Sequence, residues 1–306
     1  MSSILLLEQS LNGLQFGLML FLLAAGLTLV FGIMDMINLA HGSLYMIGAY
    51  LMATLAQATG SFIVALPLAV VATGIIGILL EVSILRRLYQ RDHLSQVLAT
   101  FALILSANEC VRLICGSQAM MLATPAALSG PVELIPGLDY PSYRLLVIGV
   151  GLAVALLLYL LVARTRTGML VRAGASNREM ATAMWVDIRR LFTGVFCVGA
   201  MLCALAGAML GPRLAVQVGM GEEILILAFV VIVIGGIGSI RGALVGALLV
   251  GMVDTIGRAF LPMLFREILP PQYASGLGPG LASILIYLLM AVVLFWKPQG
   301  LFPARG

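Results

Sequence analysis

The sequence is poor in charge. Only 10% of its 306 residues are Asp, Glu, Lys or Arg, whereas an ordinary soluble domain holds about 25%. Apolar residues make up 62% of the chain. A water-soluble core cannot bury so large an apolar share, so the composition excludes an ordinary soluble domain and indicates a protein of the lipid bilayer. We therefore expect an all-α polytopic bundle of membrane helices that forms a single domain over residues 1–306.

Lysine and histidine are nearly absent, which excludes several kinds of site. The one lysine, Lys297, is followed by Pro298, so the chain has no Gly-Lys-Ser/Thr loop for ATP phosphates. With only His41 and His93, a histidine-based metal centre would have two histidine ligands at most. The four cysteines lie in apolar runs and form no C-x-x-C pair. The sequence thus predicts no enzyme activity, no cofactor, no metal site and no nucleic-acid partner.

Apolar runs of membrane length recur along the chain. About 20 apolar residues in a helix cross the roughly 30 Å hydrocarbon layer. We expect eight or nine spans, near residues 11–33, 40–57, 62–85, 94–115, 143–163, 191–211, 222–238, 242–262 and 280–296. Two breaks, near residues 38 and 239, are either short loops or unwound, re-entrant stretches within the membrane.

The arginines predict the orientation of the bundle. Residues 164–190 hold six arginines against two acidic residues, a net charge of +4 that equals the formal net charge of the whole chain. Residues 86–93 hold three more arginines, whereas residues 116–142 have two acidic residues and no basic one. Because basic loops stay cytoplasmic, we expect residues 164–190 and the C-terminus in the cytoplasm. Nine spans would then place the N-terminus outside, and eight would place it inside.

Residues 164–190, here called the arginine-rich segment, contain a signal for a short helix. Ser176 and Glu179 fit the capping-box pattern S-x-x-E, which predicts a helix over about 177–185. Met180 and Met184 are four residues apart and would share one face of that helix. Asp187 can cap the next span.

Two interpretations of the arginine-rich segment remain open. It is either a positive-inside loop that fixes topology and lies on anionic lipid, or a docking surface for a cytoplasmic partner. A topology signal alone has no need for a capped helix, so the capping box adds weight to docking.

The two breaks are rich in polar residues or glycine. The first contains Asp35, Asn38, His41 and Gly42, and the second contains Gly235, Gly236, Gly238 and Ser239. A small-residue helix follows each break, which gives a weak internal repeat. Such repeats with interrupted helices point to a substrate path in transporters. The alternative is a tight cytoplasmic turn with glycines for packing, although polar residues near a membrane are costly choices for such a role.

Four motifs in order resemble the LivH/LivM-type permeases, the membrane subunits of branched-chain amino acid ABC importers. They are Ile37-Asn38-Leu39-Ala40-His41-Gly42 with Tyr45 to Tyr50, Arg172-Ala173 with Asn177 to Ala181, Gly235 to Ala243, and Lys297-Pro298-Gln299-Gly300-Leu301-Phe302. Their order and spacing hold over nearly the whole chain.

The resemblance implies a multi-pass permease of the bacterial inner membrane. Its partners would be a second LivH/LivM-type permease, two cytoplasmic ATP-binding subunits, a periplasmic solute-binding protein and the lipid bilayer. The missing ATP loop agrees with an energy source on another chain. The resemblance implies that Arg172-Ala173 and Asn177 to Ala181 belong to the coupling segment, and we expect ATPase coupling at Arg172, Ser176, Arg178, Glu179, Met180, Met184 and Asp187. It places the two breaks on the translocation path of branched-chain amino acids or a related small solute.

One residue departs from the family pattern. Trp185 stands where relatives of this type usually have a glycine that ends the coupling helix. Tryptophan resists positive φ, so the helix either runs on towards Asp187 or Trp185 fills an apolar slot on the ATPase or lies at the lipid interface.

A different class of protein also fits the composition. A stand-alone ion-coupled transporter or channel would use Asp35, Glu81, Glu109 or Asp254 to move protons or ions. Against this, Glu109 with Arg112 and Asp254 with Arg258 have the spacing of local ion pairs.

Overall fold

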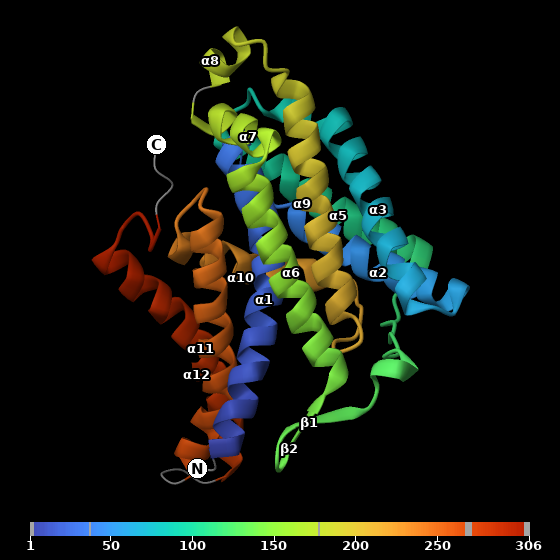
Figure 1. The fold of residues 1–306 in the computed structure, drawn as a ribbon, viewed down its shortest axis with the longest axis vertical. Coiled ribbons are helices and arrows are strands. Elements are labelled where there is room, and N and C mark those ends of the chain that lie inside the picture. The colour runs from blue at the N-terminus through green and yellow to red at the C-terminus, as the bar shows by residue number, and fades with distance from the viewer. Residues whose placement is uncertain (1–2, 37, 177, 267–270, 303–306) are drawn as a thin grey trace.

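The computed structural model describes residues 3–36, 38–176, 178–266 and 271–302, and it is a bundle of mostly long helices (Figure 1). The helices are α1 (Ser3–Met34), α2 (His41–Thr59), α3 (Phe62–Leu80), η1 (Glu81–Leu85), α4 (Arg86–Leu88), α5 (His93–Cys115), η2 (Ala126–Leu128), α6 (Ser142–Arg164), α7 (Arg166–Ser176), α8 (Arg178–Ala183), α9 (Ile188–Leu210), α10 (Met220–Gly235), α11 (Ile240–Arg266) and α12 (Pro271–Trp296). The prediction of an all-α membrane bundle is confirmed for the body of the protein.

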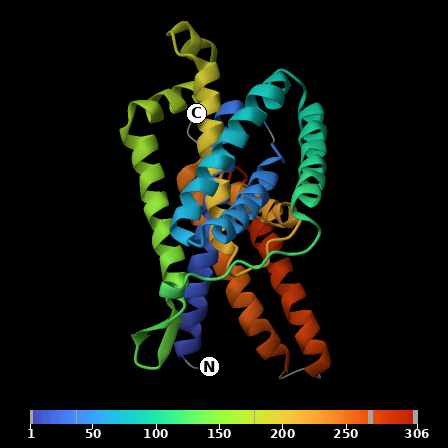
Figure 2. The same cartoon turned by 90° about the vertical axis from the view of Figure 1, so that its right-hand side faces the viewer.

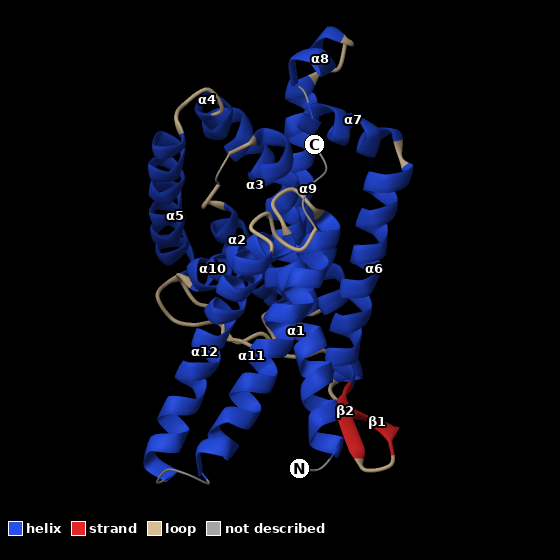
Figure 3. Cartoon of the chain, turned by 90° about the vertical axis from the view of Figure 1, so that its left-hand side faces the viewer, coloured by secondary structure: helices blue, strands red, loops and turns tan. Residues whose placement is uncertain are grey.

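A small β hairpin lies in the acidic segment before α6, where sequence analysis expects only a loop. Strands β1 (Pro131–Ile135) and β2 (Leu138–Pro141) pair antiparallel, with a register shift between Glu133 and Ile135. Figure 3 shows the hairpin at the same end of the bundle as the N-terminus. The hairpin is tied to α1, because the Tyr140 hydroxyl donates to Asn12 Oδ1 over 3.0 Å.

Each expected span falls on a helix, but not every helix is a clear span. Six helices are long and apolar enough to cross a bilayer, and they cover residues 4–34, 62–88, 93–115, 142–164, 188–210 and 240–265. Helices α2 and α10 are not among the six, and the apolar part of α12 that qualifies by composition is the shorter stretch Gly280–Trp296. The chain is therefore a multi-pass membrane protein, whereas the count of eight or nine spans is not confirmed.

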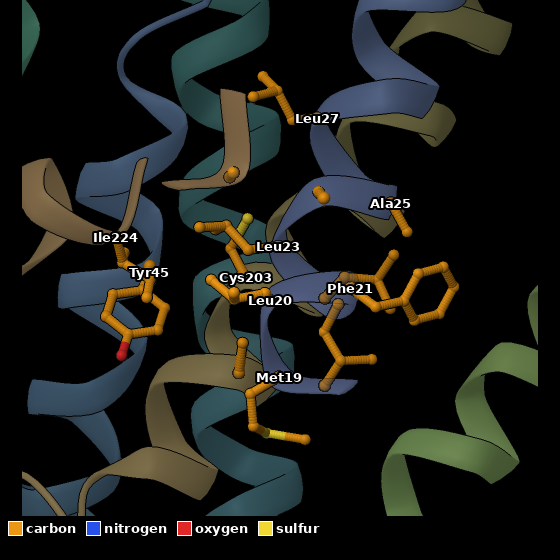
Figure 4. Packing of buried hydrophobic residues seen from close by; sticks show 14 of the residues in the cluster. Met19, Leu20, Phe21, Leu23, Ala25, Leu27, Tyr45, Cys203 and Ile224 are labelled. Atoms are coloured by element: carbon orange, nitrogen blue, oxygen red, sulfur yellow. The ribbon is translucent and has the colours of Figure 1, made fainter. Parts of the chain in front are cut away.

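Helix α1 is the centre of the bundle. Residues 18–25 are all buried, so no face of this part of the helix points outwards. Figure 4 shows α1 side chains such as Leu20 and Leu23 near Tyr45 of α2 and Cys203 of α9. By contrast, α5 stands at the edge of the bundle (Figure 2) and exposes most of its apolar residues.

Close packing of α2 against α9 depends on small residues. A Cβ on Gly207 would lie 2.2 Å from the Tyr45 carbonyl oxygen, and a Cβ on Gly48 would lie 2.4 Å from Ala204 Cα. No side chain fits at those distances. Small residues at helix crossings are the common solution inside membranes, where van der Waals contact replaces the hydrophobic effect between helices.

The two ends of the bundle differ in composition. Helices α7 and α8 and the C-terminus lie at one end, while the N-terminus and the hairpin lie at the other (Figures 1 and 3). The arginine-rich segment and the acidic hairpin segment are thus at opposite ends of the molecule.

Candidate functional site

The first break returns the chain into the bundle. Helix α1 ends at Met34, and Asp35, which is exposed, follows with φ +49°. The Asp35 N–H donates to the Phe31 carbonyl oxygen over 3.0 Å. Asn38 is buried, and its Oδ1 accepts the Ala40 N–H over 3.1 Å. This Asx turn ends the break and starts α2 at His41.

His41 lies deep beside α1 and α9. A Cβ on Gly26 would lie 3.0 Å from His41 Nε2, and a Cβ on Gly199 would lie 3.1 Å from His41 Cε1. The Phe196 ring meets the imidazole edge-on, with 5.9 Å between centroids. Gly26 is eight residues before the end of α1, which corresponds to about 12 Å along the helix. Helix α2 therefore begins beside the middle of α1 and not at its end, and the re-entrant form of the first break within the membrane stays a prediction.

Several buried polar atoms of this break and of helices α1 and α2 have no hydrogen-bond partner within the described part of the chain. They include Asn38 Nδ2, both ring nitrogens of His41, Ser43 Oγ and Tyr50 OH on the α2 side, and Thr28 Oγ1 on α1. Buried polar groups are nearly always paired in folded proteins, and leaving one unpaired costs about 1–3 kcal/mol. Because these unpaired atoms lower the stability of the fold, their concentration along α1 and α2 is not explained by a role in stabilising it.

Gly42, the second residue of α2, is a packing residue. A Cβ there would lie 2.5 Å from the carbonyl oxygen of Gly221 on α10. The backbones of α2 and α10 can approach at this point only because both residues are glycine.

The second break is a tight turn between antiparallel helices. Gly236 and Gly238 have φ values of +101° and +80°, which L side chains rarely adopt. Ser239 caps α11, because its Oγ accepts the Gly242 N–H over 3.1 Å. A Cβ on Gly235 would lie 2.3 Å from the Gly242 carbonyl oxygen. These contacts give the glycines a packing role, and the translocation role of Gly235, Gly236, Gly238 and Ser239 stays a prediction.

The C-terminal motif folds onto this same turn. The Leu301 N–H donates to the Ile234 carbonyl oxygen and the Phe302 N–H donates to the Gly235 carbonyl oxygen, each over 2.9 Å. These bonds satisfy carbonyl groups left open at the end of α10. Gly300 lies against Gly236, where a Cβ would come within 2.5 Å of the backbone. The second break and residues 300–302 of the C-terminal motif therefore form one structural unit.

The arginine-rich segment contains two helices, where sequence analysis expects one. Helix α7 begins after Thr165, whose Oγ1 accepts the Gly168 N–H over 3.1 Å. It packs beside α6, and Arg172 donates to the Val162 carbonyl oxygen. Helix α8 covers residues 178–183 within the predicted range 177–185. Ser176 is the last residue of α7, whereas Asn177 and the side chains of Arg178 and Glu179 lie outside the described part, so the capping box stays a prediction.

Of the alternatives for Trp185, the one in which the helix runs on towards Asp187 is wrong. Helix α8 ends at Ala183, and Trp185 has φ +62°. The Val186 N–H donates to the Ala181 carbonyl oxygen over 3.2 Å, and the Trp185 N–H donates to that of Thr182 over 3.1 Å. This pair of bonds is a Schellman ending with tryptophan at the left-handed position that glycine usually takes.

Replacing Trp185 with glycine should stabilise the end of α8. The left-handed conformation costs a residue with a Cβ about 1 kcal/mol, and the Trp185 side chain is 97% exposed, so it contributes little packing within the chain. We expect amide hydrogen exchange over Ala181–Val186 to slow about fivefold. Trp185→Ala keeps a Cβ and is the control. Equal exchange rates in the glycine and alanine variants would contradict the strain at Trp185.

The α8 end of the bundle presents apolar side chains away from the protein. Met180 is 63% exposed and Met184 is 72% exposed, next to Trp185. Asp187 caps α9 as predicted, because its Oδ1 accepts the Arg190 N–H over 3.1 Å. Exposed methionines form an adaptable apolar surface that suits contact with another protein.

A buried carboxylate near the same end has a role that sequence analysis did not predict. Glu81 is fully buried, and it accepts hydrogen bonds from Arg86, Tyr89 and Thr193 at 2.8–3.2 Å. Residues 81–85 form a π-helix, in which residues five apart come together. Because Glu81 and Arg86 are five apart, the pairing rules for an α-helix miss them. The network joins α3 to α9.

The two local ion pairs expected near the spans are present. Arg112 lies 3.1 Å from Glu109, and Arg258 lies 2.7 Å from Asp254. An ion-coupled transporter would use four acidic residues, as described above. With the Arg86–Glu81 pair included, three of these four acids have a basic partner. The mutual neutralisation predicted from spacing is confirmed for Glu109 and Asp254.

The sequence matches one protein family over most of its length. The family is described as the branched-chain amino acid transport system permease component, and the match covers residues 9–294. No solved structure matches the chain.

Individual relatives agree with this match. The chain is 28% identical to the high-affinity branched-chain amino acid transport system permease protein BraD of Pseudomonas aeruginosa, over 96% of this chain and 95% of the relative. It is 28% identical to LivH of Escherichia coli strain K12, over 96% of both chains. It is 25% identical to LivM of the same strain, over 92% of this chain and 67% of the relative. The interpretation as an ABC importer permease is thereby confirmed, and the chain belongs to the family of branched-chain amino acid transport system permease components.

Proposed function

We propose that this chain forms half of the membrane path of an ABC importer for branched-chain amino acids in a bacterial inner membrane. The observation that carries the proposal is the near full-length similarity to BraD and LivH, whose names state this substrate class. The absence of a Gly-Lys-Ser/Thr loop fits a chain that takes its energy from separate ATP-binding subunits.

The proposed partners follow from this role. A second permease of the LivH/LivM type would complete the path, since LivH and LivM of one organism both resemble this chain. Two cytoplasmic ATP-binding subunits would supply the energy, and a periplasmic solute-binding protein would deliver the solute. With residues 164–190 facing the ATP-binding subunits, the C-terminus also lies in the cytoplasm, because both are at the same end of the bundle (Figure 1).

We place the contact with an ATP-binding subunit on α7, α8 and the start of α9. The residues proposed for it are Arg172, Ser176, Arg178, Glu179, Met180, Met184 and Asp187. The exposed methionines beside Trp185 support this placement, because an apolar surface at the tip of a polar segment needs a partner to cover it.

We place the translocation path beside the first break, at Asp35, Asn38, His41 and Gly42. The unpaired polar atoms of Asn38 and His41 support this placement. In a transport cycle these groups would meet water or solute in another conformation, which accounts for polar side chains that cost stability here. The residues of the second break, Gly235, Gly236, Gly238 and Ser239, would frame the same path at the end of α10.

Reconstitution of the importer tests this function. The chain, its second permease and the ATP-binding subunits are placed in liposomes, and uptake of radiolabelled leucine is measured with the solute-binding protein present. We expect uptake only with ATP on the cytoplasmic side, and competition by excess isoleucine and valine but not by glutamate. Leucine uptake by the chain alone, driven by an ion gradient, would contradict the proposal.

A further inference from the structure

A groove between α3 and α9 overlaps the surface proposed for the ATP-binding subunit only at the start of α9, where Asp187 belongs to both. It has a volume of about 540 Å³ and lies where these two helices run side by side near the α8 end (Figure 1). Its walls come from α3 with η1 on one side and from the first half of α9 on the other.

One part of the groove is apolar. It is lined by Ile78 and Val82 on one wall and by Gly194 and Cys197 on the other. The neighbouring α3 side chains Ile75 and Leu79 are 54% and 62% exposed on the outside of the bundle. In a membrane span, such exposed aliphatic residues face lipid chains, so the apolar part of the groove is continuous with a lipid-facing surface.

The other part of the groove is cationic. Arg86, Arg189 and Arg190 line it, together with the carboxylate of Asp187. Arg86 is paired with Glu81 and Arg190 with Asp187, each at 3.0 Å. Within the described part of the chain, Arg189 forms no ion pair. Three guanidinium groups against two carboxylates leave one positive charge for an incoming anion.

The distance between the two parts fits an amphipathic ligand. Ile78 precedes Arg86 by eight residues, and Cys197 follows Arg189 by eight residues. Both spacings correspond to about 12 Å along a helix. The groove therefore offers a cation at one end and an apolar channel of about that length leading into the membrane.

We propose that this groove binds one anionic phospholipid, with its phosphate at Arg189 and one acyl chain along Gly194 and Cys197. Basic pockets between membrane helices on the cytoplasmic side suit anionic headgroups. A soluble anion would gain nothing from the apolar part, and a zwitterionic lipid would bring an ammonium group beside its phosphate, which weakens its pairing with Arg189. The site is separate from His41 and from the exposed methionines of α8, and it shares Asp187 and the start of α9 with the surface proposed for the ATP-binding subunit.

Two variants separate the headgroup contact from the chain contact. A Cβ on Gly194 would meet no atom within 4 Å, so Gly194→Leu starts from an open position in the groove wall and adds its side chain to the groove. The matched control is Gly149→Leu on α6, because Gly149 is also exposed and also has open space around it. Arg189→Gln removes the unpaired cation, and Arg166→Gln at an exposed position of α7 is its control.

The experiment is native mass spectrometry of the assembled importer, delipidated and titrated with palmitoyl-oleoyl phosphatidylglycerol or phosphatidylcholine. We expect one tight phosphatidylglycerol per copy of this chain, lost in Gly194→Leu and weakened about fivefold in Arg189→Gln. Both control variants should bind as the unmodified chain does. Equal binding of the two lipids, unchanged binding in Gly194→Leu, or displacement of the lipid by millimolar inorganic phosphate would overturn the proposal. So would a crosslink showing that the second permease covers the groove.

Discussion

Replacing His41 with leucine is expected to lower amino acid uptake about tenfold or more without lowering the thermal stability of the protein. Among the residues that the structure describes, neither ring nitrogen of His41 has a hydrogen-bond partner. Removing an unpaired buried polar group recovers about 1–3 kcal/mol, so the midpoint of thermal unfolding should stay the same or rise. If the imidazole binds water or solute in another conformation, that conformation loses about 1.4 kcal/mol or more, which is a tenfold effect.

The chain offers a matched control for this change. His93, the only other histidine, is exposed at the start of α5. We expect His93→Leu to leave uptake unchanged in the same reconstituted importer. Uptake at the unmodified rate by His41→Leu would mean that the ring serves packing alone, and the proposed path would have to be placed elsewhere.

The helices of this protein could be predicted from sequence because the membrane restricts the choices. Apolar runs of about 20 residues must be helices in lipid, and each predicted span falls on a helix. The number of membrane crossings could not be predicted, because α2 and α10 do not combine the length and apolar content of a clear span. Gly42 and Gly221 let the backbones of α2 and α10 approach each other, and no local sequence pattern predicts that contact.

Contacts between distant segments account for most of what sequence analysis missed. The sequence shows the glycine-rich break and the C-terminal motif as two separate patterns, and only the structure shows that Leu301 and Phe302 bond to the end of α10. The Glu81 network needs a π-helix, which no periodicity in the sequence signals. Helix extension past Trp185 is one of the alternatives that the sequence leaves open, yet the Schellman bonds impose a left-handed residue there despite the side chain.

Introducing a charge at Met184 is expected to uncouple ATP hydrolysis on the ATP-binding subunits from amino acid uptake. Met184 is 72% exposed at the end of α8. If an ATP-binding subunit covers this side chain, Met184→Asp buries an unpaired carboxylate, which costs about 3 kcal/mol or more. That cost corresponds to at least about a hundredfold loss of productive contact. The chain itself should fold and insert normally, because nothing in it packs over an exposed side chain. Met121→Asp is the control, since Met121 is 78% exposed in the segment between α5 and the hairpin.

The central claim is that ATP hydrolysis on a separate subunit is coupled to transport through the arginine-rich segment of this chain. The measurement is ATP hydrolysis by the reconstituted importer, stimulated by the loaded solute-binding protein, recorded together with leucine uptake. We predict that Met184→Asp loses both the stimulation and the uptake, whereas Met121→Asp keeps both. Full stimulation and full uptake in Met184→Asp would contradict the claim that α8 is where the ATP-binding subunit acts on this permease.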